Sequence, residues 1–237
     1  MGRPFVYINM AMTADGKIDT VERRGARISG SADTVRVDRL RADSDAIMVG
    51  GRTLLTEDPR LTVRDPRLIE QRTRVDRPPQ PMKVGVISHL ADRGPEAIAS
   101  DGAFLHEGDG QVLVCTSART DADAIAALEA EGAQVVVAGV ERVDVAAALA
   151  AVAGLGVDRL MVEGGSTLVA ALLEANLVDE LQLAVAPLLF GGSTAPTPVG
   201  GHGWARDSAR KLELIETSTS PDDEVVLRYR VIQAADR

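Results

Sequence analysis

Short apolar runs alternate with amphipathic segments along almost the whole chain, and this alternation constrains the fold more than any other feature. Seven runs are typical of strands, at residues 5–10, 46–49, 84–87, 112–115, 135–137, 160–162 and 181–185, and the continuously apolar run at 46–49 predicts a strand buried on both faces. Strands that alternate with helices favour a parallel sheet covered on both faces. The runs at 212–215 and 225–231 predict a C-terminal antiparallel hairpin. The sequence therefore predicts an α/β fold with a mixed, mainly parallel sheet.

Helical spacing of apolar residues fills several of the gaps. Val145, Leu149 and Val152 share one face after a candidate N-cap at Asp144, and residues 168–173 offer another such face. A polar stretch rich in proline, residues 60–81, is expected to be a loop within the alternation. No composition shift marks a boundary, so residues 1–237 are predicted to form a single domain.

Charge and cysteine content narrow the function. Asp and Glu number 35 against 26 Lys and Arg, so the net charge is −9, which argues against nucleic acid or an anionic membrane as partner. The single cysteine, Cys115, excludes an intramolecular disulfide and a zinc site built on cysteines, and no metal is expected. With no signal peptide or spanning segment recognisable in the sequence, a cytoplasmic protein is expected.

Two strand ends carry a double glycine followed by a helix start, Gly50–Gly51 and Gly164–Gly165. Ligands bind beyond the carboxyl ends of parallel strands, and the free N–H groups of a helix start attract phosphate. After the second pair, Ser166 and Thr167 add hydroxyl groups. A tight turn explains either pair equally well. Glu163, just before the second pair, is either a surface turn residue or a carboxylate directed at a ligand.

Basic residues supply a second signal. Asp33 is a plausible N-cap for a helix in which Val37, Leu40 and Arg41 fall on one face. A guanidinium beside a core requires an anion, and its planar fork suits phosphate. Arg64 follows a proline turn, and the two arginines together would clamp a phosphate. The alternative for Arg41 is a side chain that lies along the helix edge. Lys17 either reaches a substrate or is a solvated lysine.

These segments together resemble the pyrimidine reductase family of riboflavin biosynthesis, which has a three-layer dihydrofolate-reductase-like fold. The resemblance covers nearly the whole chain. It rests on N-M-A-M-T-A-D-G-K-I at 9–18, L-R-A-D-S-D-A-I-M-V-G-G-R-T at 40–53, E-D-P-R-L-T-V-R at 57–64, E-G-G-S-T-L at 163–168, L-V-D-E-L at 177–181 and P-L-L-F-G-G at 187–192.

The resemblance implies reduction of a ribosylaminopyrimidine 5′-phosphate to the ribitylamino product, with NADPH as hydride donor. It implies that NADPH contacts Thr53, Glu57, Ser88, Val143, Gly165, Ser166, Thr167 and Leu168. It implies that the substrate contacts Asn9, Arg41, Leu61, Arg64 and Glu163, with Lys17 and Glu163 as the catalytic residues. The family usually has aspartate at the position of Glu57 and often tryptophan at that of Arg27.

The resemblance also implies a homodimer and a reductase without the zinc deaminase domain of bifunctional members. Strand 225–231 is either a contact of this dimer or a strand inside the sheet. Two other functions stay open. One is a reductase of the same fold that acts on a pterin or dihydrofolate, against which a functional pair of Arg41 and Arg64 would argue. The other is a paralogue that binds NADPH without catalysis, against which intact Lys17 and Glu163 would argue.

Overall fold

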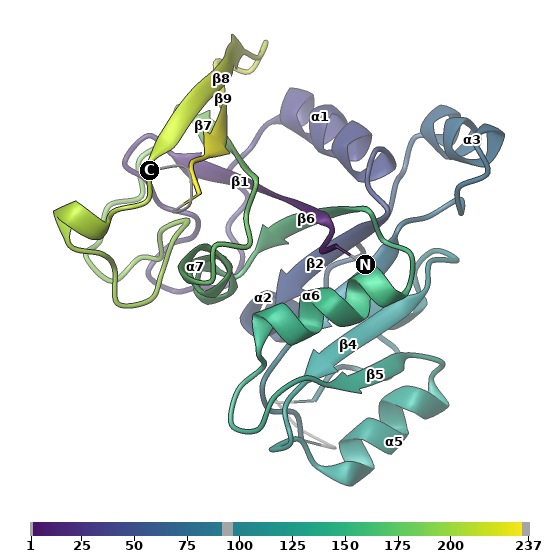
Figure 1. Cartoon of the computed structure of the whole chain (residues 1–237). Helices are drawn as coiled ribbons and strands as arrows, with labels where there is room; N and C mark the ends of the chain where they lie inside the picture. The colour runs from purple at the N-terminus through teal and green to yellow at the C-terminus, as the bar shows by residue number, and fades with distance from the viewer. Residues whose placement is uncertain (1, 92–96, 234–237) are drawn as a thin grey trace. The chain divides into compact units, whose positions relative to one another are not determined.

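The computed structural model describes residues 2–91 and 97–233 and divides the chain into two compact units (Figure 1). Unit 1 comprises Met1–Pro4 and Asp38–Met161, and unit 2 comprises Phe5–Val37 and Val162–Arg237. Helix α1 and strand β6 each contribute residues to both units. That residues 1–237 act as a single domain stays a prediction.

Over the described residues, the strands follow the order β5-β4-β3-β2-β6-β1-β7-β9-β8 in a mixed sheet of nine strands. Strands β2 to β5 pair in parallel, as do β1 and β7, whereas β9 is antiparallel to β7 and β8. The predicted mixed, mainly parallel sheet with a C-terminal hairpin is confirmed. The strands are β1 (Phe5–Thr13), β2 (Ala46–Gly50), β3 (Met82–Val86), β4 (Val112–Thr116), β5 (Gln134–Val137), β6 (Arg159–Gly164), β7 (Glu180–Ala186), β8 (Leu212–Thr219) and β9 (Val225–Val231).

Helices connect the strands, and two short ones, α4 and η1, have no counterpart in the sequence-based prediction. Within the described part of the chain, no helix combines the length and the apolar character needed to span a membrane. The helices are α1 (Ser31–Ala42), α2 (Gly51–Glu57), α3 (Pro66–Arg74), α4 (Ala103–His106), α5 (Ala122–Ala130), α6 (Val145–Gly154), α7 (Ser166–Glu174) and the 3₁₀ turn η1 (Arg206–Ser208).

Unit 1 buries both faces of its parallel strands. Every residue of β2, β3 and β4 is buried, as expected for strands between two helical layers. On one face, Ile47 and Val49 belong to a core cluster with Leu54 of α2, Phe104 of α4 and Leu128 of α5. The chain returns from β5 to β6 through α6, and right-handed crossover places this helix on the opposite face; Figure 1 shows α6 lying along the strands of unit 1.

The prediction of a loop over residues 60–81 is wrong in its centre, where α3 forms. Asp65 is the N-cap and its carboxylate accepts from the N–H of Arg67 at 2.9 Å, while Pro66 occupies the first helical position. Arg72 is only 3% exposed and donates to the carbonyls of Ala42 and Ser44. The buried residue on the inner face of α3 is an arginine and not an apolar side chain. The helical spacing of apolar residues therefore does not predict this helix.

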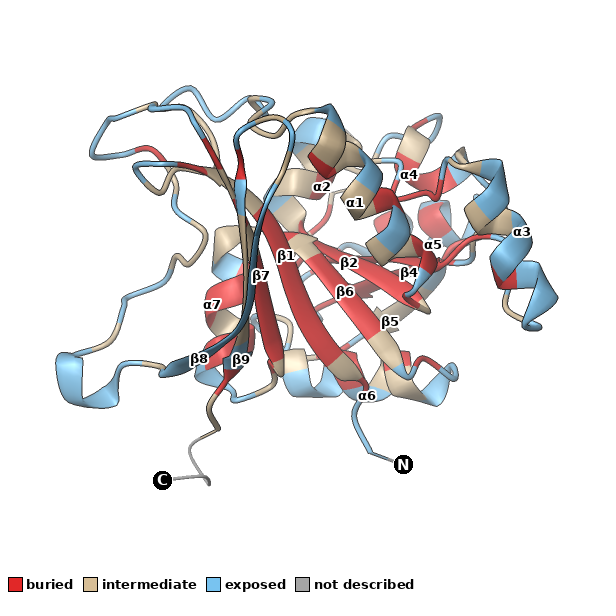
Figure 2. Cartoon of the chain, turned by 90° about the horizontal axis from the view of Figure 1, so that it is seen from above, coloured by how far each residue is buried: buried red, intermediate tan, exposed pale blue. Residues whose placement is uncertain are grey.

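Unit 2 is built on β1, β7 and the β8–β9 hairpin. Figure 2 shows β1 and β7 buried along much of their length and β8 exposed. Strand β9 lies between β7 and β8, so β8 and not β9 is the edge strand. Helix α7 packs with Val169, Leu172 and Leu173 buried, as predicted from its spacing.

The start of α1 differs from the sequence-based prediction. The helix begins at Ser31, so Asp33 lies in its first turn and is not the N-cap. The carboxylate of Asp222, in the β8–β9 turn, accepts from the N–H of Ala32 at 2.8 Å, and Glu224 accepts from that of Gly30 at 2.7 Å. A carboxylate remote in sequence satisfies the free N–H groups at the helix start, and no local pattern reveals it.

Candidate functional site

The residues that the resemblance assigns to a cofactor in unit 1 follow the carboxyl ends of its parallel strands. Thr53 lies in α2 directly after β2, Ser88 follows β3, and Val143 lies in the loop after β5. Because parallel strands end at one edge of a sheet, these positions share that edge. Glu57, the last residue of α2, is exposed and lies farther along the same helix.

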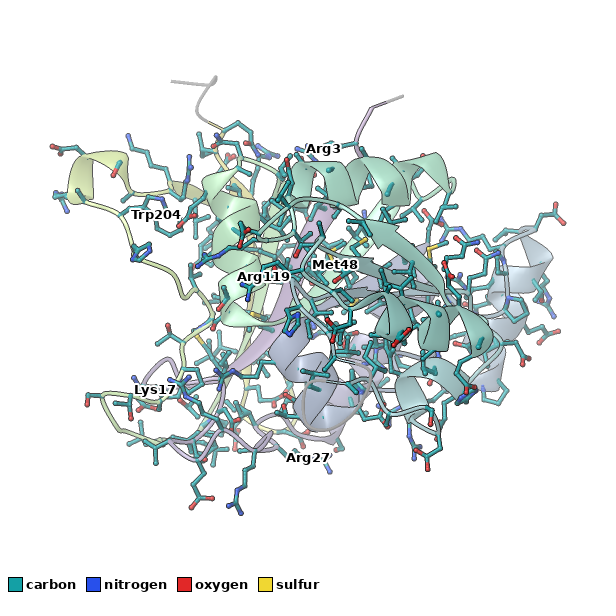
Figure 3. The ribbon with its side chains drawn as sticks, turned by 90° about the horizontal axis from the view of Figure 1, so that it is seen from below. Arg3, Lys17, Arg27, Met48, Arg119 and Trp204 are labelled. Carbon is teal, nitrogen blue, oxygen red and sulfur yellow. The ribbon has the colours of Figure 1, made fainter. Side chains whose placement is uncertain are left out.

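Two of these residues touch directly. The N–H of Val143 donates to Oγ of Ser88 at 3.1 Å, and the hydroxyl of Ser117 donates to the carbonyl of Ser88. Nδ1 of His89 lies 2.8 Å from the carbonyl oxygen of Arg119. The loops that follow β3, β4 and β5 are therefore fastened to one another around Ser88. The side chain of Arg119, which is labelled in Figure 3, is more than half exposed to solvent.

The double glycine after β2 has a packing explanation. A Cβ on Gly51 would come within 2.8 Å of Ile87, so a larger residue there would displace a buried side chain. Helix α2 has seven residues and lacks a side-chain cap. The observations at this turn fit the tight-turn alternative.

Arg41 and the loop before α3 lie together in unit 1. Nη1 of Arg41 donates to the carbonyl of Thr62 at 3.0 Å, which joins the last turn of α1 to the segment that carries Arg64. Arg41 is half-buried, as its spacing predicted, and Val37 and Leu40 are half-buried as well. Arg64 is exposed.

The position of Leu61 does not allow its side chain to contact a substrate. The side chain is 1% exposed and belongs to the core cluster of unit 1. Its backbone has φ of 50°, in the left-handed region that costs a non-glycine residue about 1–2 kcal/mol. Any contact of Leu61 with a substrate is therefore made by its backbone.

Lys17, labelled in Figure 3, lies in a turn of unit 2 that side-chain and backbone hydrogen bonds hold in place. Its N–H donates to Oγ1 of Thr13 at 2.9 Å, and its carbonyl accepts from the N–H of Thr13 at 2.8 Å. The carboxylate of Asp15 accepts from the hydroxyl of Thr13 and from the N–H groups of Phe190 and Gly191. The hydrogen bond from Thr13 is the largest cause of the lowered pKa of Asp15. Desolvation raises this pKa, and the hydrogen bonds from the two N–H groups lower it further.

Asp15 is therefore a residue of the site that the sequence analysis missed. In the sequence, the Asp15–Gly16 pair indicates only a turn. The structure shows that the same carboxylate ties this turn to the P-L-L-F-G-G segment, so two separate motifs of the resemblance are one structural feature.

Glu163 and the second double glycine form the end of β6 and the start of α7. Glu163 is half-buried and is followed by Gly164 and Gly165, with φ of 149° and 87°. Both glycines have backbone conformations that a side chain would strain. Thr167 is exposed and Ser166 half-buried, whereas the side chain of Leu168 is buried in the core. The N–H of Gly200 donates to the carbonyl of Ser166 at 3.0 Å, so a second glycine segment flanks this helix start.

Asn9 lies in the middle of β1, opposite Gln182 of β7. It is 5% exposed, and its Oδ1 has no hydrogen-bond partner among the described residues. Buried amide oxygens are normally paired, so an orphaned one is unusual. Arg27, which stands at the tryptophan position of the family, is exposed, and its Nε lies 3.3 Å from the carbonyl of Ser29.

The proposed site residues thus fall into separate groups. Unit 1 holds the strand-end group of Thr53, Ser88 and Val143 and the arginine group of Arg41 and Arg64. Unit 2 holds Asn9, the Lys17 turn, and the segment from Glu163 to Leu168. Within the described residues, no group of three or more histidine, cysteine, aspartate or glutamate side chains is arranged to hold a metal.

Comparison with solved structures defines the fold. The chain has the fold of RibD from Acinetobacter baumannii, with a TM-score of 0.76 and 22% identity over 98% of this chain and 59% of that one. It is equally similar to a pyrimidine reductase-like protein from Corynebacterium diphtheriae, with a TM-score of 0.77 and 21% identity over 97% and 92% of the two chains. The chain spans little more than half of the length of the RibD structure.

Comparison of sequences identifies the family. The model of the RibD C-terminal domain matches residues 4–226, and the chain therefore belongs to this family, as the sequence motifs predicted. The 2,5-diamino-6-ribosylamino-4(3H)-pyrimidinone 5′-phosphate reductase of Archaeoglobus fulgidus is 39% identical over 90% of this chain and 93% of its own length. The reductase of the same name from Methanothermobacter thermautotrophicus is also 39% identical, over 94% and 97%.

Proposed function

We propose that the chain reduces 2,5-diamino-6-ribosylamino-4(3H)-pyrimidinone 5′-phosphate to its ribitylamino product with NADPH. Two relatives with 39% identity over most of both chains carry the name of this reductase. The observation in the structure that carries the proposal is the hydrogen bond from Arg41 to Thr62, because it brings a half-buried guanidinium to the loop of Arg64 in an acidic protein. The planar, charged fork of an arginine suits a phosphate.

The chemistry is the addition of a hydride and a proton across a C=N bond. The ring-opened form of the ribosylamine has this bond at C1′ of the sugar. When bound, NADPH would supply the hydride for C1′, and the nitrogen on C1′ would take a proton from the medium or a side chain, which gives a secondary amine and NADP⁺. The chain's own contribution is to bind and align the two reactants.

The strand-end group of unit 1 fits a nucleotide cofactor. Thr53, Ser88 and Val143 lie at the edge where parallel sheets bind nucleotides, and Arg119 adds a cation beside them. Glu57 is the fourth contact that we propose in this unit. In unit 2 the helix start at Gly165, Ser166, Thr167 and Leu168 offers backbone N–H groups and two hydroxyls for the cofactor's phosphates.

The remaining residues serve the substrate. We assign the 5′-phosphate to Arg41 and Arg64 and a backbone contact to Leu61. Glu163 orients the sugar hydroxyls or the pyrimidine, and Lys17 hydrogen-bonds the sugar near the reacting carbon. The buried, unpaired Oδ1 of Asn9 is available to accept a hydrogen bond from the substrate. The proposed compartment is the cytoplasm, where a free buried thiol such as Cys115 stays reduced.

The test is oxidation of NADPH, followed by its absorbance, with three additions in parallel. We expect oxidation with the pyrimidine ribosylamine phosphate and not with dihydrofolate or without a second substrate. Turnover of dihydrofolate alone would favour the pterin alternative. Binding of NADPH without turnover of either substrate would favour a paralogue that binds the cofactor without catalysis.

A further inference from the structure

Side chains from two elements fix the backbone of residues 62–65 in unit 1. In addition to the bond from Arg41 to Thr62, the amide of Gln80 forms two hydrogen bonds with Val63. Its Oε1 accepts from the N–H at 2.8 Å, and its Nε2 donates to the carbonyl at 3.0 Å. Gln80 thereby pairs with Val63 as a neighbouring strand would.

Asp38 completes the set from helix α1. Its Oδ1 accepts from the N–H of Arg64 and its Oδ2 from the N–H of Asp65, both at 2.8 Å. Asp38 is 8% exposed and Gln80 is 9% exposed. Both polar side chains are therefore withdrawn from water, and both form hydrogen bonds with the backbone of the same short loop.

The loop presents its arginine outward. Arg64 is exposed, and its guanidinium makes no hydrogen bond or ion pair in the part of the chain that the structure describes. Each backbone group named above, by contrast, has a partner. A fixed backbone that carries a cation without an ion-pair partner among the described residues is the arrangement expected of a preorganised site for an external anion.

We propose that Asp38 and Gln80 are positioning residues for the substrate's phosphate, and that they act through Arg64. The inference rests on the proposed function, in which Arg64 binds this phosphate. Asp38 carries a negative charge within the anion site, but its two oxygens face backbone N–H groups, which offset that charge. Removing the carboxylate leaves two N–H groups unpaired and frees the loop, because the left-handed backbone of Leu61 just before it is stable only under outside constraint.

The experiment measures kinetics for Asp38→Asn, Arg64→Ala and the double variant. Asparagine keeps the size of aspartate but presents an N–H₂ group to one of the two N–H donors. We expect the KM of Asp38→Asn for the phosphorylated substrate to rise about 10-fold while kcat falls less than twofold. We expect Asp38→Asn to have no further effect on KM when Arg64 is already alanine, because the two act in series.

The matched control is Asp45→Asn. Asp45 also accepts two backbone N–H groups, those of Asp158 and Arg159, and its Oδ1 lies 3.5 Å from Nη2 of Arg77, but it precedes the amino end of β2 and supports none of the residues proposed to bind the phosphate. Both variants should lower the thermal midpoint, and only Asp38→Asn should raise KM. If Asp38→Asn does not fold, Gln80→Met is measured in the same way, and the same rise in KM is expected.

Binding of ribose 5-phosphate separates this inference from the proposed reaction. Calorimetry or line broadening measures the affinity of each protein for ribose 5-phosphate. Asp38→Asn should lower this affinity by about the factor by which it raises KM. The affinity for ribose, which has no phosphate, should be the same in the variant and the parent. This result would stand even if the chain reduced another sugar phosphate. Additive effects of Asp38→Asn and Arg64→Ala, or an equal loss with ribose, would overturn the positioning role.

Discussion

The carboxylate of Asp15 accepts a hydrogen bond from the N–H of Gly191 at 2.7 Å, across 176 positions of sequence. The same carboxylate holds Thr13, which pairs with both backbone groups of Lys17. We therefore expect Asp15→Ala to lower kcat/KM about 10-fold by releasing the Lys17 turn. Steady-state kinetics check this, with Asp222→Ala as a control that loses a carboxylate to the start of α1 instead. Equal losses of activity in the two variants would contradict the role of the turn.

Asp15 also predicts a dependence of stability on pH. Its pKa lies below the ordinary value of 3.8, chiefly because of the hydrogen bond from Thr13. A carboxyl group whose pKa is lower in the folded protein than in the unfolded chain stabilises the folded state. This contribution is complete at pH values above the pKa of the unfolded chain, and it is lost as the pH falls through the pKa of the folded protein. The thermal midpoint of Asp15→Asn should lie below that of the parent at neutral pH, and the gap should close below about pH 4. A gap that persists in acid would show that the charge is not its cause.

These contacts show what a sequence can and cannot reveal. The strand 46–49 was predicted almost to its ends, because a continuously apolar run needs no knowledge of its partners. The family's motifs placed Lys17 and Arg41 among the candidate site residues. The roles of Asp15 and Asp38 could not be predicted, because each depends on backbone N–H groups from a distant segment. Helix α3 was missed for a related reason, since its buried residue is an arginine whose partners are carbonyls of residues 42 and 44.

Arg41 is expected to set the affinity for the phosphorylated substrate. A hydrogen bond to a charged group contributes about 1.5–3 kcal/mol, so Arg41→Ala should raise KM roughly 10- to 150-fold. As a phosphate anchor, Arg41 should affect kcat less than kcat/KM, and the affinity for NADPH should hardly change. Arg41→Lys keeps the charge but loses the fork, and should recover part of the loss. An unchanged KM in Arg41→Ala would remove the phosphate clamp and favour a substrate without phosphate.

Arg41→Ala should also destabilise unit 1, because the guanidinium donates to the carbonyl of Thr62. Loss of one such bond is worth about 1 kcal/mol. Thermal unfolding of the variant separates this effect from catalysis. A KM measured well below the midpoint, where the variant is folded, reports on the substrate alone.

We expect the chain to prefer NADPH over NADH. The hydroxyls of Thr116 and Ser117 are not available to a 2′-phosphate, because both residues are buried and their hydroxyls bond to Thr120 and Ser88. Arg119 is the exposed cation at this strand end. Arg119→Ala should weaken NADPH about 10-fold in calorimetry and leave NADH unaffected, because only NADPH carries the extra phosphate. Equal affinities of the parent for the two cofactors would refute the preference.

A homodimer is the predicted assembly, and the structure moves its candidate contact from β9 to β8. Strand β8 lies at the edge of the sheet and exposes Leu212, Leu214 and Ile215 by 41%, 53% and 39%. An edge strand with exposed apolar residues favours pairing with another chain. Light scattering should give twice the chain mass of 25.0 kDa, and Leu214→Glu should shift it towards one chain. A mass near 25.0 kDa for the parent at micromolar concentration would refute the dimer.

Glu163 is expected to act on the rate more than on affinity. It lies at the end of β6, held by a strand on one side and by two glycines with constrained backbone on the other. Glu163→Gln keeps the shape and one acceptor oxygen but loses the charge that strengthens a hydrogen bond to a sugar hydroxyl. If that bond orients the reacting carbon, kcat should fall roughly 10- to 150-fold, from a loss of about 1.5–3 kcal/mol. Single-turnover measurements at saturating substrate report this step directly, and Arg41→Ala, which changes KM instead, serves as the contrasting variant. A Glu163→Gln enzyme with the parent's kcat and a raised KM would show that the carboxylate only binds the substrate.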